Sequence, residues 1–372
     1  MKFYLVAGER SGDLHGGNLI SSLKRLNPDL QFRGFGGDAM EDAGMKLVVH
    51  YRELAFMGFA EVLANLKTIS NRLNLCKTDI LSYNPDVVVL IDYAGFNLRI
   101  ARFAKSKGFK VFWYISPKVW AWNQSRAKQL KASIDRMFVI LPFEKEFFKK
   151  FGWHVDYVGN PVLDAVRAHQ RKGDFLEANG LQPSVPIVSL LPGSRKQEVS
   201  RIIPVMAAVA RKFPHLQFAV ARVDNLNDAL YYSLAQLPNV KVITGSTYDL
   251  LNYATAAIVT SGTATLEACL FKVPQVVVYK SSTVSYRIAR MLIRVPFISL
   301  VNLIAGKEVV KELIQQKANE ANVSTELDRI LKDKQYRDKM LNGYEEIANV
   351  LGAESASENT ARLILKYLQL SN

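Results

Sequence analysis

The chain has 372 residues, with 48 lysines and arginines against 34 aspartates and glutamates, which gives a net charge of +14. Apolar residues make up 49% of it, which is typical of a folded globular protein and excludes a largely disordered chain. A chain of this length predicts two domains. The two cysteines, Cys76 and Cys269, lie far apart in apolar patterns, so they predict buried thiols in a reducing compartment and not a disulfide framework.

The positive charge predicts an anionic partner. No nucleic-acid-binding pattern is present, and the basic residues are interleaved with apolar ones, so a membrane surface or phosphorylated ligands are favoured over nucleic acid. No stretch approaches the roughly 18 apolar residues of a membrane span, and the first apolar run is too short for a signal peptide. The five histidines form no paired cluster, so we expect no protein-bound metal. We therefore expect a cytoplasmic protein, soluble or peripheral.

Short apolar runs rich in β-branched residues alternate with helical patterns, which predicts α/β architecture with parallel sheets. We expect two Rossmann-like, doubly wound domains, residues 1–165 and 183–350, facing a cleft. The polar segment 160–184 would connect them, and a last helix, 356–372, would pack back on the first domain. The strands predicted in chain order are 2–7, 31–36, 86–92, 110–116, 136–141 and 155–159, then 186–191, 216–222, 240–244, 256–260 and 274–279.

The first predicted strand runs into a loop with two glycines that would let backbone approach a ligand. Its polar side chains are placed to accept hydrogen bonds from sugar hydroxyls. The alternative is an ordinary turn between strand and helix, in which Ser11 or Asp13 caps the helix. The candidate residues of this loop are Glu9, Ser11, Gly12 and Asp13.

The predicted strand over 86–92 delivers Asp92 at its carboxyl end, where ligands collect in such sheets. An apolar surround would raise the proton affinity of this carboxylate and suit it to act as a general base on a hydroxyl. Asn97 follows closely and makes the loop a candidate ligand site. The alternative is that Asp92 caps the next helix. The aromatic-rich run 113–123 suits sugar rings or the core, and its Lys118 can reach a phosphate.

Two stretches of the second domain are apolar strands that end in Gly/Ser turns. After the strand over 186–191 come Ser194 and Arg195, placed for a charge-assisted bond to a diphosphate. After the strand over 256–260 a helix begins, whose first turn presents free N–H groups to an anion. The remaining candidate nucleotide-binding residues are Ser261, Gly262, Thr263, Glu267 on a ribose hydroxyl, and Asn302. The alternative is a capped helix with an ordinary exposed glutamate.

Two segments combine an apolar face with basic residues, 53–75 and 284–300. Such faces favour contact with an anionic bilayer surface. The more common alternative is an amphipathic helix that packs on the core and leaves its lysines and arginines in water.

Together these residues resemble the lipid A disaccharide synthase family, and the likeness spans nearly the whole chain. It rests on the order and spacing of segments 7–17, 56–63, 90–97, 114–126, 141–144, 157–161, 190–199, 260–270 and 299–316. The resemblance implies a two-domain glycosyltransferase fold of the B type and a metal-independent, inverting transfer. The donor would be UDP-2,3-diacylglucosamine and the acceptor 2,3-diacylglucosamine 1-phosphate, joined through a β-1′,6 bond with release of UDP.

In this interpretation Asp92 is the base and no cofactor is needed. Glu9, Ser11, Gly12, Asp13 and Asn97 line the acceptor side, and the residues of the second domain named above bind the nucleotide. The partner surface would be the anionic cytoplasmic face of the inner membrane, and the sequence leaves a homodimer open. Two alternatives remain: a UDP-sugar epimerase of the same architecture, and a non-catalytic lipid-binding peripheral protein.

Overall fold

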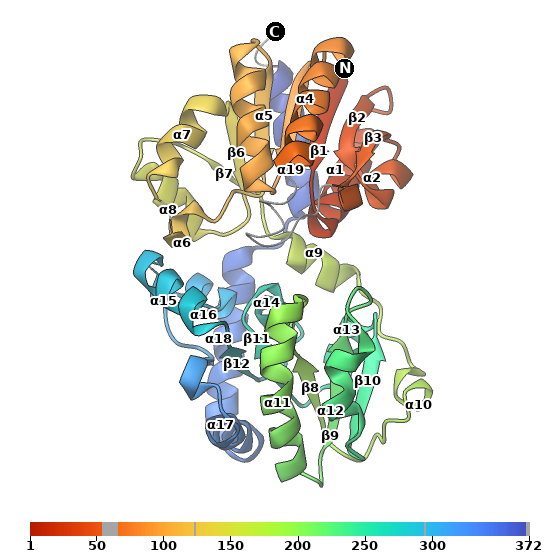
Figure 1. Cartoon of the computed structure of the whole chain (residues 1–372), viewed down its shortest axis with the longest axis vertical. Coiled ribbons are helices and arrows are strands. Elements are labelled where there is room, and N and C mark those ends of the chain that lie inside the picture. Colours follow the sequence, from red (N-terminus) through yellow and green to blue (C-terminus); the bar gives the residue numbers. More distant parts are fainter. Residues whose placement is uncertain (54–65, 123, 294, 370–372) are drawn as a thin grey trace. The chain divides into compact units, whose positions relative to one another are not determined.

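The computed structural model describes residues 1–53, 66–122, 124–293 and 295–369. The chain forms two compact units. Unit 1 comprises Met1–Pro161 and Ala353–Asn372, and unit 2 comprises Val162–Gly352. Each unit is a parallel sheet covered by helices (Figure 1), which confirms the predicted α/β class.

The sheet of unit 1 has seven parallel strands in the order β3-β2-β1-β4-β5-β6-β7. The strand order reverses direction between β1 and β4, which is where doubly wound sheets bind ligands. The strands are β1 (Lys2–Ala7), β2 (Gln31–Gly36), β3 (Lys46–His50), β4 (Val87–Ile91), β5 (Lys110–Tyr114), β6 (Arg136–Val139) and β7 (Asp156–Tyr157).

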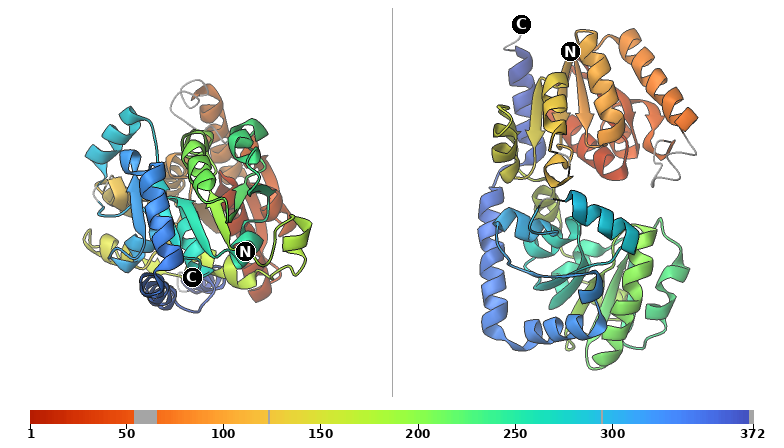
Figure 2. Two further views of the ribbon diagram at one scale, coloured as in Figure 1. Left: turned by 90° about the horizontal axis from the view of Figure 1, so that it is seen from below. Right: turned by 60° about the vertical axis from the view of Figure 1, so that its left-hand side comes forward.

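The helices of unit 1 cover both faces of this sheet, as the views in Figures 1 and 2 show. They are α1 (Arg10–Leu26), α2 (Asp38–Asp42), α4 (Leu66–Tyr83), α5 (Ala94–Ser106), α6 (Val119–Trp122), α7 (Arg126–Ser133), α8 (Phe143–Lys149) and α19 (Ala356–Gln369), with a 3₁₀ turn at Tyr51–Glu53.

The last helix, α19, packs against the first, α1, although more than 300 residues of chain separate them. Ile364 and Leu368 of α19 share one buried apolar cluster with Leu19 of α1. At the surface Arg25 and Glu358 form an ion pair of 2.9 Å. The apolar stripe of the C-terminal helix therefore completes the core of unit 1.

The sheet of unit 2 has six parallel strands in the order β10-β9-β8-β11-β12-β13, so its strand order reverses between β8 and β11. Both faces of the sheet are covered, because Val188 and Leu190 of β8 belong to one apolar cluster and Ile187 and Leu191 to another. The strands are β8 (Ile187–Leu191), β9 (Gln217–Arg222), β10 (Val240–Thr244), β11 (Ala256–Thr260), β12 (Gln275–Tyr279) and β13 (Lys311–Ile314).

Along the chain, the helices of unit 2 come before, between and after these strands. They are α9 (Pro161–Ala168), α10 (Phe175–Ala178), α11 (Lys196–Lys212), α12 (Tyr232–Ala235), α13 (Thr247–Tyr253), α14 (Thr263–Leu270), α15 (Thr283–Leu292), α16 (Leu300–Ala305), α17 (Glu320–Lys332) and α18 (Lys334–Leu351), with 3₁₀ turns at Asp228–Tyr231 and Gln315–Lys317.

The structure departs from the predicted organisation in two places. Two edge strands, β3 and β13, are absent from the predicted set. The segment after Pro161, predicted to connect the domains, belongs to unit 2, since Leu163 and Phe175 are buried in its two apolar clusters. Within the described ranges, no helix combines the length and the apolar character that a membrane crossing requires.

Candidate active site

Asp92 and Tyr93 stand directly after β4, at the reversal point of the unit 1 sheet. Both have a left-handed backbone, with φ of 46°, before α5 begins at Ala94. A left-handed residue other than glycine costs about 1–2 kcal/mol. Strain of this kind persists where the surroundings enforce it, and it gathers at functional sites.

The electrostatic surroundings of Asp92 suit a base. Burial raises the pKa of this carboxyl, while Lys118 and a hydrogen bond from the backbone of Tyr93 act in the opposite direction. The backbone N–H of Asp92 donates to the carbonyl of Tyr114 at 3.1 Å, which ties the loop to the neighbouring strand β5. The half-buried carboxylate therefore holds a proton more readily than an exposed aspartate does.

The loop after β1 meets the loop after β4. A Cβ atom added to Gly8 would lie 2.2 Å from the Tyr93 ring, so only glycine fits at this point. Burial, and after it the carboxylate of the half-buried Glu9, raises the pKa of Tyr93. Ser11 is exposed on the first turn of α1. The structure thus places Glu9 near Tyr93, the neighbour of Asp92, at the carboxyl ends of the central strands β1 and β4.

Asp13 has a structural role that the sequence interpretation does not include. Its side chain is buried, and its carboxylate accepts hydrogen bonds from the N–H groups of Gly37, Ala39 and Met40 at 2.7, 3.1 and 3.1 Å. These three groups begin α2, so Asp13 joins α1 to the second helix. The expected contact between Asp13 and a sugar is corrected accordingly.

Asn97 and Gly12 are also internal. The Asn97 side chain is fully buried, and its Nδ2 donates to the carbonyls of Val6, Ile91 and Asp92 at 3.2, 3.2 and 2.9 Å. It therefore holds the ends of β1 and β4 together and positions Asp92, while its buried Oδ1 has no hydrogen-bond partner among the described residues. Gly12 lets α1 approach the sheet, because an added Cβ would lie 3.3 Å from that of Ala7.

The two predicted nucleotide motifs of unit 2 come together at the corresponding place. Strands β8 and β11 pair directly, with Leu191 opposite Val259, so the loops that follow them are neighbours. Gly193 turns the first loop with φ of 102°, and the exposed Ser194 and Arg195 precede α11. An Arg195 nitrogen lies 3.2 Å from a carboxylate oxygen of Glu198, which holds the guanidinium beside this turn.

The second loop leads into α14, which starts at Thr263 with Gly262 in the N-cap position. The first N–H groups of a helix have no partner within it and carry partial positive charge. Ser261 donates its hydroxyl to the carbonyl of Ile298 at 2.7 Å, which fixes the loop from the side. A helix start and an arginine therefore stand at the ends of two adjacent strands, an arrangement that suits a diphosphate.

Glu267 lies one turn into α14 and is half-buried. Burial raises the pKa of this carboxyl, and a hydrogen bond of 3.0 Å from the hydroxyl of Tyr248 opposes the increase. Tyr248 comes from α13 and is a partner of Glu267 that the sequence does not predict. No local sequence signal identifies it, since it contacts Glu267 from another helix.

We expect Tyr248→Phe to raise the donor KM about 3- to 10-fold with a smaller effect on kcat, since one hydrogen bond that orients Glu267 is lost. Steady-state kinetics with varied donor measure this. Tyr253→Phe is the matched control on the same helix, because the Tyr253 hydroxyl bonds only the carbonyl of Lys172 in the described contacts. Equal donor KM values in all three proteins would refute the role of Tyr248.

Asn302 is corrected from a nucleotide ligand to a structural residue. Its side chain is fully buried. Its Nδ2 donates to the carbonyl of Val310 and to Glu312, both at 2.9 Å, and its Oδ1 accepts from the N–H groups of Val309 and Val310. These bonds attach α16 to the segment that leads into β13 and leave nothing for a ligand.

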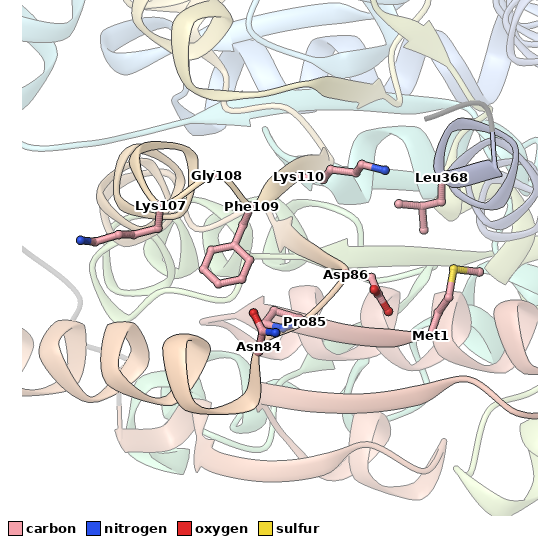
Figure 3. A pocket seen from close by; sticks show the side chains of 9 residues that line it. All are labelled: Met1, Asn84, Pro85, Asp86, Lys107, Gly108, Phe109, Lys110 and Leu368. Carbon is pink, nitrogen blue, oxygen red and sulfur yellow. The ribbon is translucent and has the colours of Figure 1, made fainter. Parts of the chain in front are cut away.

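A separate hollow of about 430 Å³ lies in unit 1 at the amino ends of three central strands (Figure 3). Its walls come from segments that precede strands β1, β4 and β5 and from Leu368 of α19, whereas Asp92 follows β4. The hollow therefore does not belong to the candidate site. Among the residues that the structure describes, no group of three or more His, Cys, Asp or Glu is placed to hold a metal ion. The residues that line the hollow are Met1, Asn84, Pro85, Asp86, Lys107, Gly108, Phe109, Lys110 and Leu368.

Comparison with known proteins agrees with this geometry. The family described as lipid-A-disaccharide synthetase matches residues 3–365. A lipid-A-disaccharide synthase of Syntrophus aciditrophicus (strain SB) is 40% identical, over 99% of this chain and 98% of its own length. The chain belongs to the lipid-A-disaccharide synthetase family. Its role is therefore that of a disaccharide synthase in lipid A biosynthesis, a glycosyltransferase that uses a UDP-sugar donor and a phosphosugar acceptor.

Solved structures support the fold of the family. A UDP-GlcNAc 2-epimerase from Neisseria meningitidis, bound to UDP-GlcNAc, matches all of this chain and all of its own with a TM-score of 0.69 at 15% identity. The glycotransferase of kitacinnamycin matches 99% of each chain with a TM-score of 0.67 at 13% identity. At these identities the likeness shows the fold alone, which is the B-type glycosyltransferase fold that the sequence predicts.

Proposed function

We propose that this family member joins UDP-2,3-diacylglucosamine to 2,3-diacylglucosamine 1-phosphate with inversion at the anomeric carbon. The observation that supports this most directly is the position of Asp92. This half-buried residue, with a left-handed backbone, stands where the strand order of a doubly wound sheet reverses. The products are the tetraacyl disaccharide 1-phosphate and UDP.

In the proposed step, Asp92 takes the proton from the acceptor hydroxyl as its oxygen attacks the anomeric carbon of the donor. The new carbon–oxygen bond forms on the face opposite the departing diphosphate, and the bond from the anomeric carbon to the phosphate oxygen breaks. Burial raises the pKa of Asp92 and so brings it closer to the working pH, where a general base is most effective. The proton is then on Asp92, and UDP is the leaving group.

On the donor side, we assign the diphosphate to Arg195 and to the start of α14, and a ribose hydroxyl to Glu267. The leaving group gains negative charge as the glycosidic bond breaks, and fixed donors aimed at that charge lower the barrier. Arg195 and the helix N-terminus supply this stabilisation from protein groups alone. The Tyr248 hydroxyl holds the Glu267 carboxylate at the side of the helix where the ribose would lie.

The disaccharide product made by the purified protein in the presence of a chelator is expected to contain a β-1′,6 linkage. Nuclear magnetic resonance of the isolated product, through the anomeric coupling constant, determines this configuration. An α-linked product would contradict the single-displacement mechanism. Loss of product with chelator, and its recovery when magnesium is added, would contradict the metal-independent mechanism.

We also propose that the protein works on the anionic cytoplasmic face of the inner membrane, because its acylated substrates reside in a bilayer. Part of the support comes from α15 and the residue that follows it. Arg287 and Arg290 are exposed, and so are the apolar side chains of Met291 (84%) and Ile293 (40%). Basic and apolar groups on one short segment suit a negatively charged surface. Most of the other expected segment, 54–65, lies outside the described residues.

The double substitution Met291→Ser and Ile293→Ser is expected to reduce sedimentation with anionic vesicles about 3-fold or more, since two exposed apolar side chains leave the interface. Added salt should weaken the binding of the unmodified protein by screening its arginines. The matched control is Tyr232→Ser with Val350→Ser, two exposed apolar residues elsewhere on unit 2. Equal sedimentation of both double variants would exclude this segment as the contact.

A further inference from the structure

Unit 1 contains a buried carboxylate that the proposed mechanism does not use. Glu144, on the first turn of α8, is 1% exposed. One of its oxygens accepts from the Ser116 hydroxyl and from Trp120 Nε1 at 3.0 Å. The other accepts from the N–H groups of Ile140 and Leu141 at 3.2 and 2.9 Å.

No lysine or arginine is among these four hydrogen-bond partners. Burial raises the pKa of Glu144 to about 7 although all four hydrogen bonds act to lower it. Tyr157 also faces Glu144, and burial together with that carboxylate raises the tyrosine pKa to about 12. A buried acid costs free energy even when it is hydrogen-bonded. This cost indicates that Glu144 has a role beyond packing.

The two side chains that Glu144 holds flank Lys118 symmetrically along the chain. Ser116 lies two residues before it and Trp120 two residues after it, and both are buried whereas Lys118 is exposed. The same loop contains Ile115 with φ of 68°, a left-handed conformation that is rare for a β-branched residue. The loop shape is thus enforced, and Glu144 anchors it on both sides of the lysine.

Lys118 is the charged side chain that acts on Asp92. Strands β4 and β5 are paired, with Ile91 opposite Tyr114, so the loop that carries Lys118 begins beside Asp92. The ammonium group stabilises the ionised Asp92 carboxylate and lowers its pKa against the effect of burial. The other groups facing this carboxylate are the Tyr93 backbone N–H and, beyond the Tyr93 ring, Glu9.

We propose that Glu144 is a positioning residue whose carboxylate grips the loop on both sides of Lys118 and so fixes that ammonium group beside Asp92. The proposal rests on the proposed function of Asp92 as the base. Lys118 controls how much of the base is ionised at a given pH, and Glu144 controls where Lys118 stands. A residue that only packed α8 against the loop would not affect the ionisation of Asp92.

The test compares the pH dependence of kcat/KM for the acceptor in four proteins: unmodified, Lys118→Met, Glu144→Gln and the double variant. Loss of the ammonium group raises the pKa of Asp92, so the acidic limb should move to higher pH in Lys118→Met. At a pH on that limb, kcat/KM should fall about 3-fold or more beyond any change at the alkaline plateau. Glu144→Gln should move the limb in the same direction. The double variant should match Lys118→Met, because both changes act through one group.

The matched control is Glu326→Gln in unit 2. Glu326, like Glu144, is a buried glutamate, and its carboxylate accepts a hydrogen bond from Tyr336. Its acidic limb should coincide with that of the unmodified protein. If Glu144→Gln does not fold, Ser116→Ala and Trp120→Phe each remove one anchor of the loop and leave Glu144 in place. Each should then move the limb part of the way.

Three outcomes separate the proposals. An unchanged acidic limb in Glu144→Gln, with a uniform loss of activity at every pH, would overturn the positioning role. Additive shifts in the double variant would also overturn it, since Glu144 would then act independently of Lys118. Retained turnover in Asp92→Asn would instead overturn the assignment of the base.

Discussion

Asp92→Asn is expected to lower kcat by about 10²- to 10⁴-fold while the affinity for UDP stays within about 2-fold of the unmodified protein. The amide keeps the size of the carboxylate but cannot take a proton from the acceptor hydroxyl. Asp92 belongs to unit 1, whereas the residues assigned to the nucleotide belong to unit 2. Turnover measured as UDP release, and UDP binding measured by calorimetry, give the two quantities separately.

Asp86→Asn is the matched control for this prediction, because Asp86 precedes β4 just as Asp92 follows it, and it accepts a hydrogen bond from the Lys2 N–H at 2.7 Å. It should keep kcat. A large loss of UDP affinity with residual turnover in Asp92→Asn would make Asp92 a nucleotide ligand instead of a base.

The pH dependence of the reaction follows from the same residue. A base works in its ionised form, and burial raises the pKa of Asp92 above the usual value for aspartate. Activity should therefore be present above that raised pKa and decline as the pH falls through it. Burial raises the pKa of Glu144 to about 7, so this second carboxyl also titrates within the pH profile, and the Glu144→Gln profile removes its contribution.

Arg195→Ala and Glu267→Gln are each expected to raise the donor KM about 10- to 100-fold, as expected for loss of a hydrogen bond to a charged group. Arg195 is exposed at the start of α11, and its ion-pair partner Glu198 keeps 18% of its side chain exposed when Arg195 is removed. Glu267→Gln keeps an oxygen for the Tyr248 hydroxyl and removes only the charge. The KM for the acceptor should change much less in both variants.

Arg201→Ala is the control for Arg195, since Arg201 is exposed farther along the same helix. It lowers the net charge equally but lies away from the turn after β8. A donor KM that is unchanged in both Arg195→Ala and Glu267→Gln would contradict the nucleotide site at β8 and β11. An equal increase in Arg201→Ala would indicate a general effect of net charge.

Most of the sheet could be predicted from the sequence, because strands covered on both faces are continuous apolar runs. The two strands that were missed lie at sheet edges and are only partly buried: β3 shows one buried residue in five and β13 one in four. Their apolar runs are short, three residues in β3 and two in β13, and pairing with a neighbour defines them.

The site could be predicted where function depends on position along the chain. Asp92 follows β4 directly, and in unit 2 the pairing of β8 with β11 makes neighbours of the loops that carry Arg195 and the start of α14. The sequence places Asp13, beside Gly12, and Asn302, within an apolar run, in the site because a polar residue has the same local pattern whether it binds a ligand or the protein itself. The partners of Asp13 lie 24 to 27 residues away, which sequence pattern alone does not show.

Glu144 and Tyr248 are residues whose contacts the sequence does not predict. Ser116 and Trp120 reach Glu144 across 28 and 24 residues, and Tyr248 reaches Glu267 across 19. Neither residue stands in a motif with an obvious chemical role. Both become visible only when burial and hydrogen-bond partners are known.

The most direct test of the central claim is the release of UDP by the purified protein from UDP-2,3-diacylglucosamine, with and without 2,3-diacylglucosamine 1-phosphate. We expect UDP and a disaccharide in equal amounts, and only when both substrates are present. Conversion of the UDP-sugar to its epimer without acceptor would identify an epimerase of the same fold. Binding of both lipids with no product would identify a non-catalytic lipid-binding protein, and either result would contradict the disaccharide synthase role.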